Sequence, residues 1–204
     1  MKIAVGGAIG SGKSTYCKWL EEELGIKLIN EFEEDDKFFK FALKEMYSGE
    51  KYAVNLLQYY FLQHSFNVSQ TKENVIVDRD MLEHNIFAEN SMEKKTIDYK
   101  AYKSSFDVYW KNHIKPDFYI LLDCDWEVAK LRILKRGRQE EIVNFKKNED
   151  YFFKLHNIYF GKLIQSCCNE NIKTIIINSN EDKFYEKTEN IEKINKIKRE
   201  IRKV

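Results

Sequence analysis

The sequence predicts an α/β fold in which helices cover both faces of a five-stranded parallel sheet. Three observations support this prediction. Short apolar runs alternate with longer helical segments along the chain. Two of the runs, 75–77 and 174–177, are continuous rather than alternating, as is typical of strands buried on both faces. The first run also leads directly into a glycine-rich loop and a helix, an order found at the ligand-binding edge of parallel sheets.

The predicted elements fill most of the chain. We expect strands over residues 2–6, 26–30, 74–78, 118–123 and 173–178. We expect helices over residues 13–25, 36–47, 51–71, 81–89, 99–114, 126–136, 145–171 and 182–202. One proline and eight glycines leave little room for linkers, so residues 1–204 are expected to form a single domain.

The last predicted helix is amphipathic. Lysine and arginine lie opposite an apolar stripe at helical spacing, which consists of Ile191, Ile194, Ile197, Ile201 and Val204. The stripe favours packing against the sheet. The basic segment 193–203 leaves a membrane-surface helix as the alternative.

The composition narrows the functional class. A chain of 204 residues is long enough to bury a core, and its net charge of +1 gives no global field that would recruit nucleic acid or a membrane. The four cysteines lack the spacing of a disulfide framework, and the four histidines lack metal-ligand spacing. No signal peptide or membrane-spanning run is recognisable. We therefore expect a cytoplasmic protein with reduced thiols and no nucleic-acid or membrane partner.

A complete G-x-x-x-x-G-K-[ST] loop follows the first strand. It predicts that backbone N–H groups converge on the phosphates of a nucleoside triphosphate at a helix N-terminus. Lys13 would reach the outer phosphates, and the Ser14 hydroxyl would hold Mg²⁺. The expected nucleotide-binding residues are Gly7, Ala8, Ile9, Gly10, Ser11, Gly12, Lys13, Ser14 and Thr15. A purely structural glycine turn is the alternative.

Two acidic residues follow predicted strands at the edge of the sheet where this loop lies. Glu31 follows the second strand and can accept a proton from an attacking hydroxyl. Asp78 ends the third strand, where it can coordinate Mg²⁺ directly or through water. The next residue, Arg79, can contact phosphate or orient a carboxylate. A structural salt bridge among these charges is the alternative.

A cluster of arginines follows the fourth strand. Arg132, Arg136 and Arg138 lie at the end of a predicted helix and around Gly137. Their planar guanidinium groups suit a lid, at about residues 135–145, that binds phosphate and stabilises the charge being transferred. A solvated basic helix end is the alternative.

The chain has no arginine before Arg79. An anionic acceptor such as a nucleoside monophosphate would be expected to need arginine there, whereas the segment offers carboxylates and aromatic rings. We therefore expect an uncharged alcohol as the phosphoryl acceptor. A nucleoside monophosphate kinase or another small-metabolite kinase is the alternative. A nucleotide-controlled switch protein is less well supported, because no N-K-x-D base-reading motif occurs at a suitable place.

These motifs together resemble those of the deoxyribonucleoside kinases, including bacterial deoxyadenosine and deoxyguanosine kinases. The resemblance runs from Ile3 to the segment beyond Glu141. Besides the loop, it rests on Glu31 after strand two, Tyr47 eleven residues before Gln58, the Asp78-Arg79 pair, and an R-x-R-x-E-E segment at 136–141. It implies a P-loop kinase fold with an arginine-rich lid. It also implies transfer of the γ-phosphate of ATP, with Mg²⁺, to the 5′-hydroxyl of a deoxynucleoside in nucleotide salvage.

The resemblance implies catalytic roles for several of these residues. Glu31 would activate the 5′-hydroxyl. Arg79 would orient it and help to stabilise the moving phosphoryl group, near Lys13. Arg136 and Arg138 would close over the phosphates. Members of this family are usually dimers, so a homodimer is expected.

The resemblance also implies the substrate contacts. Tyr47 and Glu141 would hold the sugar 3′-hydroxyl, and Gln58 would hydrogen-bond the base edge together with Asp107. A glutamine amide can present its donor and acceptor in either order, so the base stays open, with a purine weakly favoured by the resemblance.

Two positions depart from the family pattern. Proline commonly follows the catalytic glutamate and serine commonly follows the acidic-arginine pair, whereas this chain has Phe32 and Asp80.

Overall fold

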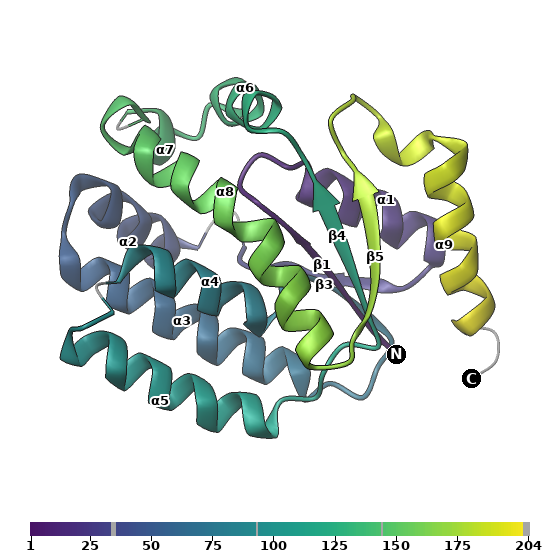
Figure 1. Ribbon diagram of the computed structural model, residues 1–204, viewed down its shortest axis with the longest axis horizontal. Coiled ribbons are helices and arrows are strands. Elements are labelled where there is room, and N and C mark those ends of the chain that lie inside the picture. Colours follow the sequence, from purple (N-terminus) through teal and green to yellow (C-terminus); the bar gives the residue numbers. More distant parts are fainter. Residues whose placement is uncertain (34–35, 93, 144, 202–204) are drawn as a thin grey trace.

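The computed structural model describes residues 1–33, 36–92, 94–143 and 145–201. Its centre is a five-stranded parallel sheet with the strand order β2-β3-β1-β4-β5. Helices flank both faces of this sheet (Figure 1). The predicted α/β fold is confirmed.

The elements follow the predicted order. The strands are β1 (Lys2–Gly7), β2 (Lys27–Ile29), β3 (Val75–Asp78), β4 (Phe118–Asp123) and β5 (Lys173–Asn178). The helices are α1 (Lys13–Leu24), α2 (Lys37–Ser48), α3 (Lys51–Ser69), α4 (Met81–Ser91), α5 (Ile97–Asn112), α6 (Trp126–Arg136), α7 (Gln139–Ile142), α8 (Phe145–Asn169) and α9 (Thr188–Ile201), with a 3₁₀ turn, η1 (Phe184–Glu186), before α9.

Strand β1 is the central strand, and all six of its residues are buried. It pairs in parallel with β3 on one side and with β4 on the other. Strand β2 pairs in parallel with the outer side of β3. The carboxyl ends of β1, β2 and β3 therefore meet at one edge of the sheet, where a ligand site is expected.

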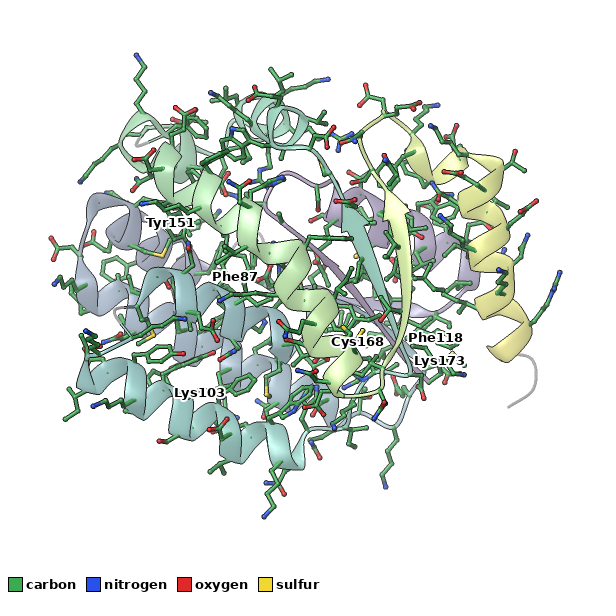
Figure 2. All side chains as sticks on the ribbon, viewed as in Figure 1. Phe87, Lys103, Phe118, Tyr151, Cys168 and Lys173 are labelled. Carbon is green, nitrogen blue, oxygen red and sulfur yellow. The ribbon has the colours of Figure 1, made fainter. Side chains whose placement is uncertain are left out.

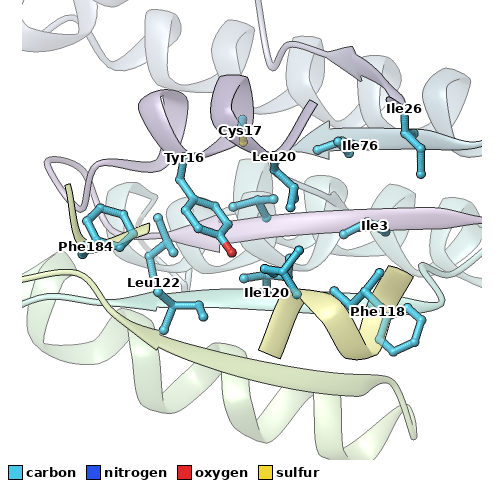
Figure 3. Close-up of a cluster of buried hydrophobic side chains, with 14 residues drawn as sticks. Ile3, Tyr16, Cys17, Leu20, Ile26, Ile76, Phe118, Ile120, Leu122 and Phe184 are labelled. Carbon is cyan, nitrogen blue, oxygen red and sulfur yellow. The ribbon is translucent and has the colours of Figure 1, made fainter. Parts of the chain in front are cut away.

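Two apolar layers hold the sheet between its helices. On one face, Tyr16 and Leu20 of α1 and Ile194 of α9 pack against buried strand residues such as Ile120 (Figure 3). On the other face, helices α4 and α8 pack against β1 and β4. The burial of Ile194 and Ile197 confirms that the last helix packs on the sheet. Within the described ranges, every helix is too short or too polar to cross a bilayer.

The expectation that the fifth strand is buried on both faces is wrong. Ile177 is fully buried in the core, but its neighbour Ile176 on the opposite face is 44% exposed. Because β5 is an edge strand, one of its faces stays partly open to solvent.

The predicted helix 182–202 begins later than expected. Lys183 has a positive φ of 52°, which is incompatible with an α-helix. The turn η1 follows, and the Asn190 amide donates a hydrogen bond to the Phe184 carbonyl at 2.7 Å, which closes this turn ahead of α9. The predicted helix end at residue 202 and the apolar position 204 lie outside the described residues.

Candidate active site

A cavity of about 1080 Å³ opens at the edge of the sheet where β1, β2 and β3 end. It brings together nearly all the residues singled out in the sequence. Those lining it are Ala8, Ile9, Gly10, Ser11, Gly12, Lys13, Ser14, Thr15, Glu31, Tyr47, Gln58, Asp78, Arg79, Arg132, Arg136, Arg138 and Glu141. Gly7 lies just before this set, at the end of β1.

The phosphate loop connects β1 to α1, and two of its glycines have backbone conformations that favour glycine. Gly10 has φ 84°, and a Cβ there would lie 2.4 Å from the Ala129 carbonyl oxygen. Gly12 has φ 89° and caps the N-terminus of α1. The loop therefore presents backbone N–H groups and the positive end of a helix dipole, which fits a bound phosphate chain.

Glu31 and Arg79 form a buried ion pair in this cavity. The Arg79 guanidinium donates from Nη1 to both Glu31 oxygens, at 3.0 and 2.7 Å. Burial alone would raise the pKa of Glu31, but the neighbouring Arg79 and Lys13 outweigh burial and lower it to about 2. Glu31 is therefore an ionised proton acceptor with a fixed orientation throughout the neutral pH range.

Lys13 is buried and pairs with Asp78, and its Nζ lies 3.9 Å from Glu31 Oε2. Burial, followed by the charge of Arg79, lowers the pKa of Lys13 to about 8. The Ser14 hydroxyl donates to Asp78 Oδ2 at 3.4 Å. A hydroxyl and a carboxylate side by side are the oxygen donors that Mg²⁺ prefers when phosphates complete its coordination. These residues therefore fit a magnesium–nucleotide complex.

The predicted lid segment begins where α6 ends at Gly137 and contains the short helix α7. The Glu141 carboxylate is buried and accepts hydrogen bonds from Arg136 and from Arg138, the latter at 3.0 Å. The two arginines thus face the cavity as a pair held by one acid. Closure of this segment stays a prediction, and residue 144 lies outside the described part of the chain.

Arg132 has a different partner set from the one expected. Its guanidinium donates to backbone carbonyls after β5, at 2.7 Å to Ser179 and 3.0 Å to Glu181. It also donates to the Ser11 carbonyl at 3.4 Å. Arg132 therefore ties the loop after β5 to the phosphate loop, although it still lines the cavity.

The structure places Asp107 outside the cavity and gives no support to the predicted contact with the base. Asp107 lies on the exposed side of α5, where its side chain pairs with Lys103 one turn earlier, at 2.5 Å. Figure 2 labels Lys103 on this helix, at the lower edge of the view. Asp107 is not among the residues that line the cavity.

The cavity residues that were not predicted from the sequence include His84 and Phe87 of α4 and Tyr151 of α8 (Figure 2 labels the last two). The His84 ring stacks on Phe61 with centroids 5.0 Å apart, and its Nδ1 lies 4.0 Å from Glu31 Oε1. Burial lowers the pKa of His84 to about 4, so the imidazole is neutral at neutral pH. The available signal was its position on the first turns of a helix that starts beside Arg79.

The two departures from the family pattern have separate structural roles. Phe32 stacks on Phe39 with centroids 3.8 Å apart, and the Arg138 guanidinium lies 5.3 Å from the Phe32 ring centre. Phe32 therefore adds a cation–π contact to the lid arginine.

Asp80 lies outside the cavity and caps the N-terminus of α4. It is buried, with His113 Nε2 at 2.8 Å and Lys2 Nζ at 3.6 Å. Its negative charge is therefore compensated away from the phosphate site. The four cysteines are free thiols, and among the residues described no group of three or more histidines, cysteines or acids could hold a metal ion.

Comparison with known proteins identifies the family. The family model for deoxynucleoside kinases matches residues 3–203. The Bacillus subtilis deoxyadenosine/deoxycytidine kinase is 32% identical over 167 residues, which is 77% of this chain and 74% of that protein. An uncharacterised Mycoplasma pneumoniae protein is 33% identical over 195 residues, covering 88% of this chain and 82% of that protein.

A solved structure supports the same assignment. A deoxyadenosine kinase from M. mycoides, bound to dATP, superimposes with a TM-score of 0.78 and 27% identity, covering 97% of this chain and 99% of that one. The fold is therefore that of the P-loop kinases to which this structure belongs. Together with the family match, it establishes that the chain belongs to the deoxynucleoside kinase family.

Proposed function

We propose that this protein transfers the γ-phosphoryl group of ATP to the 5′-hydroxyl of a deoxynucleoside, in nucleotide salvage. The observation that carries the proposal is the buried Glu31–Arg79 pair, which lies in the same cavity as the phosphate loop. Lys13 Nζ is only 3.9 Å from Glu31 Oε2. A proton acceptor and a phosphate-binding cation are thus adjacent, as transfer to a hydroxyl requires.

The proposed reaction is a single in-line displacement. The substrate 5′-oxygen forms a bond to the γ-phosphorus while its proton passes to Glu31. The bond from the γ-phosphorus to the β,γ-bridging oxygen breaks, and its electron pair leaves with ADP. The products are ADP and the deoxynucleoside 5′-monophosphate. Arg79 holds Glu31 in place and offers positive charge to the moving group.

The nucleotide phosphates would lie on the loop 8–15, with Lys13, Arg136 and Arg138 supplying positive charge around them. Ser14 and Asp78 would hold Mg²⁺, which supplies charge neutralisation of the phosphates when it is bound. Asp78 pairs with Lys13 in the present structure, so Lys13 would exchange this carboxylate for phosphate oxygens.

The deoxynucleoside would occupy the part of the cavity lined by Tyr47, Gln58 and Glu141. Burial, followed by the nearby Glu141 charge, raises the pKa of Tyr47 well above its usual value, so its hydroxyl remains a donor. A buried carboxylate and a tyrosine hydroxyl suit a sugar hydroxyl. Gln58 Oε1 has no partner among the described residues and is available to a base.

The base preference rests on the relatives. The Bacillus subtilis relatives are named as a deoxyadenosine/deoxycytidine kinase and a deoxyguanosine kinase, and the M. mycoides structures hold dATP or dCTP. These names favour a purine deoxynucleoside weakly over a pyrimidine. In addition to Gln58, the neutral His84 ring offers a polar edge to the cavity.

The acceptor class is tested by ADP release in a coupled assay with ATP and Mg²⁺. Deoxyadenosine, deoxyguanosine, deoxycytidine and thymidine are each compared with their 5′-monophosphates. We expect turnover on at least one nucleoside, highest with a purine, and about 100-fold lower kcat/KM for every monophosphate. Faster turnover on monophosphates would instead assign a nucleoside monophosphate kinase. Slow ATP hydrolysis that no acceptor stimulates would support a switch protein.

We also propose a homodimer. Tyr52, Leu56 and Tyr59 are exposed along one side of α3, and Ile97 at the start of the adjacent α5 is 82% exposed. Such an apolar surface favours burial against a second copy. Light scattering should give twice the chain mass of 24.5 kDa. Leu56→Lys should shift the population toward monomer. A mass of one chain for the unaltered protein would contradict the dimer.

A further inference from the structure

Glu83 is a fully buried carboxylate in the first turn of α4, four residues after Arg79. It does not line the cavity, so substrates bound there would not contact it. Taking a carboxylate out of water is costly unless hydrogen bonds and opposite charges compensate for it. Its partners therefore indicate what it does.

Four hydrogen-bond donors surround the Glu83 carboxylate. Oε1 accepts from the Tyr119 hydroxyl at 2.6 Å and from the Asp80 backbone N–H at 3.2 Å. Oε2 accepts from the Tyr159 hydroxyl and from the Gly7 backbone N–H at 3.3 Å. Both oxygens thus face hydrogen-bond donors. A carboxylate can accept at both positions, whereas an amide would place its NH₂ group, itself a donor, at one of them. The donors come from β4, α8, the end of β1 and the start of α4.

The Arg79 guanidinium lies 4.7 Å from the Phe87 ring centre and has three polar neighbours, of which Glu83 is one. Arg79 Nη1 binds Glu31, and Nη2 donates to the Gly7 carbonyl at 3.2 Å. Arg79 Nε forms an ion pair with Glu83 Oε2 at 3.4 Å but makes no hydrogen bond to it, and the same oxygen accepts from the Gly7 N–H. Arg79 itself has φ 71°, in the left-handed region that non-glycine residues avoid unless their surroundings impose it.

We propose that Glu83 is a positioning residue that fixes the Arg79 guanidinium relative to the phosphate loop. The inference rests on the proposed function, because it assigns Glu83 to the same phosphoryl transfer. One oxygen of Glu83 forms an ion pair with Arg79 and accepts a hydrogen bond from Gly7, so Glu83 sets the distance between the start of the loop and the group that orients Glu31. It acts through Arg79 and contacts neither substrate.

The variant Glu83→Gln tests this role, because the amide keeps the shape but presents a donor where only acceptors fit. We expect kcat to fall about 10- to 100-fold, with the KM for the nucleoside and the dissociation constant for ATP changing less than about threefold. Glu89→Gln is the matched control. It removes a carboxylate from the same helix that pairs with Lys162 and Lys94 outside the cavity, and it should leave kcat unchanged.

A double-mutant cycle separates positioning from general support of the fold. In an Arg79→Lys background, Glu83→Gln should lower kcat by less than about twofold, because the group through which it acts is gone. The inference would be overturned if Glu83→Gln lowered kcat equally with Arg79 and with Lys at position 79. It would also be overturned if Glu83→Gln alone left kcat unchanged. If Glu83→Gln does not fold, Tyr159→Phe replaces it, because this variant removes one of the donors to Glu83. Its effect on kcat is then compared with and without Arg79→Lys. Inactivity of the unaltered protein toward every nucleoside would contradict the proposed function itself.

Discussion

Replacing Glu31 by glutamine is expected to lower kcat by about 100- to 10,000-fold, the range over which general-base catalysis contributes. Glutamine occupies the same space and can still accept a hydrogen bond from Arg79, but it cannot take the proton of the 5′-hydroxyl. Because Glu31 follows β2 and is not part of the phosphate loop, ATP affinity should change by less than about twofold. The kcat is measured with the best nucleoside substrate, and the ATP dissociation constant is measured by calorimetry.

The control for this prediction is Glu73→Gln, which alters an exposed acid just before β3, at the opposite edge of the sheet. It should leave both quantities unchanged. A second readout is the pH profile of kcat/KM. Since the pKa of Glu31 is lowered to about 2 in the free protein, no acidic limb from this residue should appear between pH 5 and 7. Retained turnover in Glu31→Gln would contradict the general-base role.

The parts of the fold and site that the sequence predicts well depend on local patterns. The loop motif places Lys13 and Ser14 at the start of a helix, and strand ends place Glu31 and Asp78 at the same edge of a parallel sheet. These consequences need no knowledge of distant contacts. The arginines at 136 and 138 follow in the same way from the end of α6.

The parts that were wrong or missed depend on helix orientation and on burial. Asp107 lies on α5, and nothing in its local pattern says which side of α5 faces the cavity. His84 and Glu83 are neighbours on α4, and both are buried by parts of the chain that are distant in sequence: α3 and α8 pack on α4, and Glu83 also contacts β1 and β4. A lone histidine and a lone acid in a helical pattern are usually surface residues, so their burial became visible only in the tertiary structure.

Arg132 shows a second reason why the sequence could not predict every contact in the site. Its residue type and position agree with a phosphate-binding arginine, yet its donors are engaged by the carbonyls of Ser179 and Glu181. The loop it holds lies between β5 and η1, about 50 residues later in the chain than Arg132. Backbone acceptors of this kind carry no sequence signature, because every residue has a carbonyl group.

Replacing Lys13 by methionine is the second large effect that we expect. Lys13 Nζ pairs with Asp78 in the structure, and the proposed reaction requires it to bind the outer phosphates. Loss of one preorganised cation from such a site lowers turnover by about 100- to 1,000-fold. Because the same cation is expected to contact the phosphates in the ground state, ATP affinity should fall as well. Lys27→Met, an exposed lysine on β2, is the matched control.

The pH dependence of ATP binding tests whether the Lys13 ammonium is the group that supports ATP affinity. Burial lowers the pKa of Lys13 to about 8 in the free protein, and bound phosphates favour its charged form. Above pH 8 the free protein must take up a proton to bind, so the ATP dissociation constant should rise about tenfold per pH unit. Below pH 8 the lysine is already charged, and affinity should be flat. In Lys13→Met the slope above pH 8 should vanish, and an unaltered slope there would assign the proton to another group.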